Sequence, residues 1–333
     1  MNKTGIWYLL LAQCNHTHSV HMKGLLEWRN PVGFLNGILF AYLPMYFCIA
    51  TSFLLLFLLW TFFVIKYRGN LLGLQHVVTL AIIIALAENA MWAFNFIDYD
   101  LNGKIVDVIN MVCASLTAGK FTIIRLAILL VSLGHSIVVP SLEIKTKLFA
   151  TLMTLFYFAA ATMCTYVWVM SNVNFKFPEL LEIITLTSYI LINFIYVLWV
   201  VISLSRQYKT LYDAHQYEKL SNYKKLVAFL VFFFIISVVV FFCQVASYVL
   251  KLRDQYWQVW WIWDAYWEFG YFFVLLLIAG LWWPNKNNKR YAYSTQLDTE
   301  DDFPLDDEPH LNVHLEDHDD DDNDDIGPGD QQL

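Results

Sequence analysis

Residues 226–250 read LVAFLVFFFIISVVVFFCQVASYVL and contain no Asp, Glu, Lys or Arg. A bilayer core of about 30 Å is crossed by roughly 20 apolar residues in a helix. The run is long enough for that crossing and too long for a strand, and it lacks the strict alternation of a barrel strand. It predicts a transmembrane helix and decides the class of the fold.

Six further segments are also long and predominantly apolar, without the alternation of a barrel strand. With the first run they give seven predicted spans: 38–65, 76–97, 106–133, 147–171, 180–205, 226–250 and 263–283. Polar breaks with turn and charge signals separate them, as at 66–70 and 98–103. The sequence therefore predicts an all-α integral membrane protein with a seven-transmembrane helix bundle.

The composition supports a membrane protein. The chain is 58% hydrophobic and 15% charged, against about 25% charged in soluble domains. Residues 298–333 hold 16 of the 29 acidic residues and no Lys or Arg, so 1–297 has 21 basic and 13 acidic residues, a net +8. A basic, apolar body with an acidic tail does not indicate a nucleic-acid binder.

The distribution of Lys and Arg predicts the orientation. With the N-terminus lumenal, the inner segments hold 12 basic residues and the outer segments 7, as the positive-inside rule requires. The C-terminus is then cytosolic, and Asn15, in the sequon Asn15-His16-Thr17, is a glycosylation candidate on the lumenal side.

Three parts follow from this division: a short lumenal segment 1–35, the seven-helix domain 36–285 and a cytosolic tail 286–333. The apolar run from Ile6 to Ala12 is either a vestigial signal sequence or an unprocessed leader. The tail is acidic, contains Pro304, Pro309 and Pro328, and is expected to be disordered.

This sequence lacks the residues that several familiar functions of seven-helix proteins require. The last span has no lysine for a retinal Schiff base, and the nine histidines are not clustered as a metal-dependent hydrolase requires. The third span ends in Val131, Ser132, Leu133 and Gly134, without the switch motif of rhodopsin-like receptors. We therefore expect no enzymatic activity, no cofactor and no metal.

Ionisable residues at membrane depth are costly and usually face a partner or water. The candidates are Glu88, Lys120, Arg125, Asp264 and Glu268. Glu88 and Lys120 are expected about 13 Å and 21 Å below the outer ends of neighbouring helices, within reach of each other if the lysine stem extends upward. Arg125 is expected nearer the cytosolic face, where it could extend to lipid headgroups.

Two interpretations of the pair remain open. Either Glu88 and Lys120 form a buried ion pair that fixes helix register, or with Glu268 they line a polar cavity for a ligand, lipid headgroup or ion. Asp264 lies beside a tryptophan cluster that is typical of an interfacial belt.

The C-terminal part of the bundle resembles a known family. The resemblance rests on the third-span motif Val131, Ser132, Leu133, Gly134 with Pro140, and on Leu281, Trp282, Pro284, Asn287, Asn288, Arg290, Tyr291 and Ala292 after the last span. These motifs are similar to those of the lung seven-transmembrane receptor family, closest to its transmembrane protein 87 group, and Glu88 matches the family's membrane glutamate. The match covers roughly residues 24–305.

The resemblance implies a receptor-like, Wntless-like bundle and roles in Golgi and endosome-to-Golgi traffic, with receptor and cation-channel activity as alternatives. It also implies a lumenal GOLD-like module, which we expect this chain to lack. Implied partners are membrane lipids, sorting adaptors at the tail and an unknown lumenal ligand or cargo. The chain departs from the family pattern at Trp283, usually arginine, at His135-Ser136, usually tyrosine-glycine, and at Glu268, usually basic.

The third inner loop, expected at 206–225, offers three tyrosine-x-x-leucine tetrapeptides that begin at Tyr208, Tyr217 and Tyr223. Sorting adaptors recognise this pattern in extended segments, but it also occurs often by chance, and this loop could equally be a helical extension. The acidic tail is the stronger candidate for an adaptor-binding segment.

Overall fold

The computed structural model describes residues 29–31, 33–104, 106–135, 138, 142–172, 178–250, 252 and 255–286. Asn15, Pro140, Asn287, Asn288, Arg290, Tyr291, Ala292 and the acidic tail lie outside the described residues.

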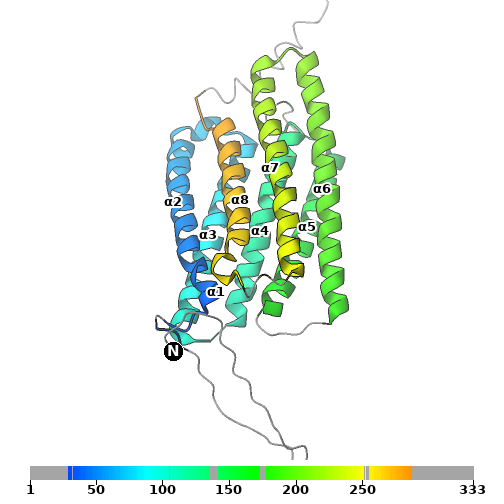
Figure 1. Ribbon diagram of the computed structural model, residues 1–333. Helices are drawn as coiled ribbons and strands as arrows, with labels where there is room; N and C mark the ends of the chain where they lie inside the picture. Colours follow the sequence, from blue (N-terminus) through cyan, green and yellow to red (C-terminus); the bar gives the residue numbers. More distant parts are fainter. Residues whose placement is uncertain are drawn as a thin grey trace, which may run out of the picture. The chain divides into compact units, whose positions relative to one another are not determined.

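Helices account for most of the described chain (Figure 1). They are α1 (Gly37–Phe40), α2 (Tyr42–Lys66), η1 (Arg68–Asn70), α3 (Gly73–Asn102), α4 (Asp107–Ser132), α5 (Ile144–Asn172), α6 (Glu179–Asp213), α7 (Tyr217–Val249), η2 (Trp257–Val259) and α8 (Ile262–Leu281). Within the described residues, seven helices are long and apolar enough to cross a membrane. The predicted all-α seven-span fold is confirmed.

The helices alternate in direction, so consecutive spans are antiparallel neighbours, and α8 returns to pack against α2, α3 and α4. The inner helices are α3, α4 and α8. In each of them 44% of the most apolar stretch is buried inside the bundle, against 6% in α7. A helix that is apolar all round but little buried presents most of its surface to lipid. The inner helices are therefore the ones that can hold polar groups away from lipid.

Aromatic side chains form the core between α2 and α8. Phe53 and Trp60 have no exposed surface, and Phe53 meets Phe272 edge-on at 5.1 Å between ring centroids. Trp60 donates to Thr79 Oγ1 at 2.9 Å and meets Trp283 edge-on at 5.4 Å. Trp283, where the family usually has arginine, thus has a packing role here.

Two span boundaries differ most from the prediction, the end of α6 and the start of α7. The inner loop expected at 206–225 is mostly helical, because α6 continues to Asp213 and α7 begins at Tyr217. Both helices continue past their apolar runs into charged sequence, which hydropathy alone does not register. The third tetrapeptide tyrosine, Tyr223, has no exposed surface and donates to the Val131 carbonyl at 2.8 Å.

Candidate functional site: a buried ion-pair triad

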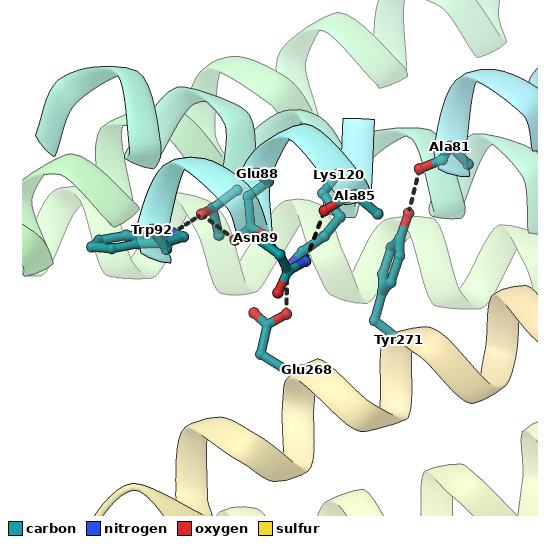
Figure 2. Close-up of polar contacts among 9 residues, drawn as sticks. Ala81, Ala85, Glu88, Asn89, Trp92, Lys120, Glu268 and Tyr271 are labelled. Atoms are coloured by element: carbon teal, nitrogen blue, oxygen red, sulfur yellow. Dashed lines mark hydrogen bonds and ion pairs between the residues drawn. The ribbon is translucent and has the colours of Figure 1, made fainter. Parts of the chain in front are cut away.

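Three charged side chains from the three inner helices meet inside the bundle (Figure 2). Lys120 Nζ of α4 lies 2.9 Å from Glu88 Oε2 of α3 and 2.6 Å from Glu268 Oε2 of α8. We call Glu88, Lys120 and Glu268 the triad. It joins helices that are distant in sequence, because Glu268 lies 148 positions after Lys120.

Neutral groups extend the network on the α3–α4 side. Thr117 donates its hydroxyl to Glu88 Oε1 at 2.9 Å, and Trp92 Nε1 donates to that hydroxyl at 3.0 Å. Both Glu88 oxygens therefore have a donor, as a buried carboxylate requires. The sequence signal for Thr117 was its place one helical turn before Lys120, which puts both side chains on one face of α4.

Aromatic rings enclose the ammonium group. Lys120 Nζ lies 5.1 Å from the ring centroid of Phe121 and 5.4 Å from that of Tyr271, both within cation–π range. Tyr271 also donates to the Ala81 carbonyl of α3 at 3.5 Å, which ties α8 to α3 beside the triad (Figure 2).

The triad is closed to solvent. Glu88 and Lys120 have no exposed surface, and Glu268 is 6% exposed. In this conformation the three side chains contact one another. The geometry is that of a buried ion pair with a second carboxylate.

The triad has two carboxylates for one ammonium, so its formal charge is −1 when all three groups are ionised. A buried charge without a partner costs several kcal/mol, and a proton on one carboxylate or a bound cation would offset it.

Asn89, next to Glu88, donates to the Ala85 carbonyl at 2.7 Å, while its buried Oδ1 has no partner in the described part of the chain.

Arg125 lies apart from the triad. Its guanidinium turns back along α4 toward the Phe121 carbonyl, donates to Asn193 Oδ1 of α6 at 2.6 Å and lies 4.6 Å from the ring centroid of Tyr157 in α5. The expectation that Arg125 extends toward the nearer headgroups was wrong. A side chain on an α-helix points toward the N-terminus of that helix, and here it finds polar partners in that direction.

Asp264 also lies outside the triad, one helical turn before Glu268. It accepts a short hydrogen bond from the Tyr42 hydroxyl and so joins the start of α8 to α2. Of the five membrane candidates, the structure brings together Glu88, Lys120 and Glu268, and places Arg125 and Asp264 at separate helix contacts.

The third-span motif ends α4. Gly134 has φ of +71° and follows the helix in the left-handed conformation that favours glycine. Ser132 donates to the Leu129 carbonyl at 2.8 Å, and the Val131 carbonyl accepts from Tyr223, as described above. Of the last-helix motif, Leu281 ends α8 and buried Trp282 follows it.

A family model described as "GOST, seven transmembrane domain" matches residues 41–289, which include helices α2 to α8. The chain belongs to this family. The resemblance to the lung seven-transmembrane receptor family, and to its transmembrane protein 87 group, is thereby confirmed.

Relatives in this family cover most of the chain. Transmembrane protein 87A of Xenopus tropicalis is 26% identical over 298 residues, 89% of this chain and 54% of that protein. Transmembrane protein 87B of Homo sapiens is 26% identical over 86% of this chain and 51% of its own length. Membrane protein PTM1 of Saccharomyces cerevisiae is 28% identical over 85% of this chain and 55% of its own length. The chain spans about half the length of these relatives.

Proposed function

We propose that this chain is a non-enzymatic multi-pass protein of Golgi and endosomal membranes that acts in membrane traffic, in endosome-to-Golgi retrieval or cargo handling. The observation that supports this role is the family match over residues 41–289, since the resemblance implies Golgi traffic. The triad would keep the inner helices in one register while the bundle handles cargo, and the acidic tail would bind sorting adaptors.

The test is deletion of the gene in its native cells, followed by imaging of Golgi-resident and recycling cargo. We expect cargo to shift toward endosomes or the cell surface and to return when the full chain is re-expressed. A Lys120→Met chain, expressed to the same level, should rescue less well than a chain with Lys225→Met, a change at an exposed lysine. Unchanged cargo distribution after deletion would refute the trafficking role.

The excess of carboxylates in the triad favours a second candidate, a cation channel. Negative groups at membrane depth lower the electrostatic barrier to a cation. In the described conformation the Lys120 ammonium is paired with both carboxylates. Purified full chain in liposomes should then conduct K⁺, with currents altered by Glu88→Gln and Lys120→Met and unaltered by Lys225→Met. Pure protein without conductance would end this alternative.

A further inference from the structure

A polar groove lies where α4 ends, α5 begins and α6 passes, at the opposite end of α4 from its start at Asp107. Its volume is about 230 Å³, and six of its eight lining residues are polar or charged. The lining residues are Ser132, Leu133, Leu142, Glu143, Thr146, Ser203, Arg206 and Gln207. We call this feature the terminal groove. It shares no residue with the triad.

The floor of the terminal groove offers hydrogen-bonding groups. Ser132 is 1% exposed and Ser203 9% exposed. The Gln207 amide nitrogen is buried and has no hydrogen-bond partner within the described residues. Buried amide donors are nearly always paired, so this one indicates a missing acceptor.

The rim bears opposite charges. Arg206 of α6 and Glu143, just before α5, are both exposed. Within the described part of the chain, these two side chains form no ion pair with each other. A ligand that carries both an anionic group and a hydrogen-bond donor would satisfy both.

An apolar seam continues from the groove along the membrane-spanning part of α5 and α6. Phe149 follows Thr146 by three positions, Trp199 precedes Ser203 by four, and the two rings meet at 4.9 Å between centroids. Residues three or four apart on a helix share a face. The Phe149 side chain is 52% exposed, and Leu148 and Leu152 beside it are 60% and 44% exposed. An occupant of the groove could therefore place an apolar chain directly against lipid-facing residues.

We propose that the terminal groove binds the head group of a phospholipid whose phosphate is followed by a hydrogen-bond donor, with the acyl chains along the α5–α6 seam. Arg206 and the Gln207 amide bind the phosphate, since a guanidinium and an N–H are the donors that phosphate oxygens prefer. Glu143 accepts from the amine or hydroxyl beyond it. The place fits a lipid, because the ends of spanning helices lie at headgroup depth.

The test uses the full chain in nanodiscs of equal parts phosphatidylcholine and phosphatidylethanolamine, with retained lipids counted by native mass spectrometry. Phosphatidylcholine has the phosphate but no donor beyond it, so the wild type should retain phosphatidylethanolamine in excess. Arg206→Gln should lower that retention about tenfold, the effect of one charge-assisted hydrogen bond. Glu143→Gln should reduce the preference between the two lipids, and Lys209→Gln, three positions along α6 from Arg206, should change neither.

Two results would overturn the proposal: retention in the bulk ratio by the wild type, or equal losses in the Arg206 and Lys209 variants. Soluble phosphoethanolamine that binds the protein in pure phosphatidylcholine nanodiscs as tightly as the lipid does would also overturn it, because the seam would then contribute nothing. If Arg206→Gln does not fold, Gln207→Glu, which exchanges a donor for an acceptor of the same size, should give the same loss.

Discussion

Lys120 is the residue on which the triad depends. It is the sole cation within ion-pair distance of two buried carboxylates in the described bundle. Removing one partner of a buried ion pair is far more costly than never having formed it, because the remaining charges stay buried and unpaired. The three members of the triad should therefore respond unequally to substitution.

We predict that Lys120→Met destabilises the bundle by about 3–5 kcal/mol, the range for a broken buried pair. Glu268→Gln should cost under about 1 kcal/mol, because Lys120 keeps Glu88 and the formal charge of the triad falls to zero. Thermal unfolding of the purified chain in detergent would measure both, with Lys225→Met as the control. Adding Glu88→Gln to Lys120→Met should recover part of the loss, and an equal effect of the two single changes would contradict this account.

His135 gives a pH-dependent prediction outside the membrane-spanning segments. Burial, and next the charge of Lys147, lower the pKa of His135 from its ordinary value of 6.5. The folded state therefore binds fewer protons than the unfolded state, and stability must fall as pH decreases below 6.5. The melting temperature of the wild type should drop more between neutral and acidic pH than that of His135→Asn. His215→Asn, at an exposed histidine, should behave like the wild type.

At the residue scale, the sequence predicted part of the site. Membrane depth singled out Glu88, Lys120 and Glu268, because charges inside an apolar run stand out. The sequence could not show that Arg125 faces Asn193 instead of extending to lipid headgroups. The helix that Arg125 faces depends on how α4 is rotated about its own axis. The sequence does not define this rotation, because the neighbouring apolar helices have no distinct polar face.

At the scale of elements, the way α4 ends determines the contact between α4 and α6. Gly134 follows the end of α4 with a φ of +71°, and a Cβ at this position would lie 2.4 Å from the Gln207 amide nitrogen. The left-handed φ favours glycine, and the Gln207 side chain would have to move to admit a Cβ. The backbone conformation therefore explains the glycine of the third-span motif, which the resemblance to a family alone did not explain.

We predict that Gly134→Ala destabilises the bundle by about 1–2 kcal/mol, from the left-handed backbone alone, with a further loss from the contact with Gln207. Gly280→Ala is the matched control, since a Cβ there would meet nothing within 4 Å. Thermal unfolding of both variants tests the comparison. Equal melting temperatures for the two would mean that the turn after α4 adjusts freely.

The helices were predicted well where apolar runs define them. Their ends were predicted less well where a helix continues into charged sequence. The seven spans agree with the observed helices. For 206–225 the sequence left open a loop or a helical extension, and the structure shows the extension, with α6 continuing to Asp213 and α7 beginning at Tyr217. Tyr208 and Tyr217 are therefore held in helices, and Tyr223 is buried. This arrangement makes the tetrapeptides poor adaptor ligands, because adaptors bind the pattern in extended form.

At the scale of the whole molecule, charge and helix direction together give the orientation. The alternating helices place Lys66, Lys147, Arg206, Lys224 and Lys286 at the same end of the bundle. From the positive-inside rule we predict that this end is cytosolic and that the start of α2 is lumenal. We predict that Asn15 is glycosylated in cells, so that glycosidase treatment increases gel mobility. Asn15→Gln should remove the shift, and an unshifted wild type would count against a lumenal N-terminus.

The acidic tail supplies the last prediction. Residues 298–333 hold 16 acidic residues and no Lys or Arg, whereas the family match ends at residue 289. The bundle should therefore fold without the tail, while an adaptor with a basic surface should need it. A chain that ends at residue 297 should keep the wild-type melting temperature but leave the Golgi, as seen by fluorescence microscopy. Replacing every Asp and Glu of the tail by Asn and Gln should mislocalise the chain equally, because the expected adaptor recognises the charge of the tail and not its length. Golgi residence of the truncated chain would assign the sorting signal to the bundle.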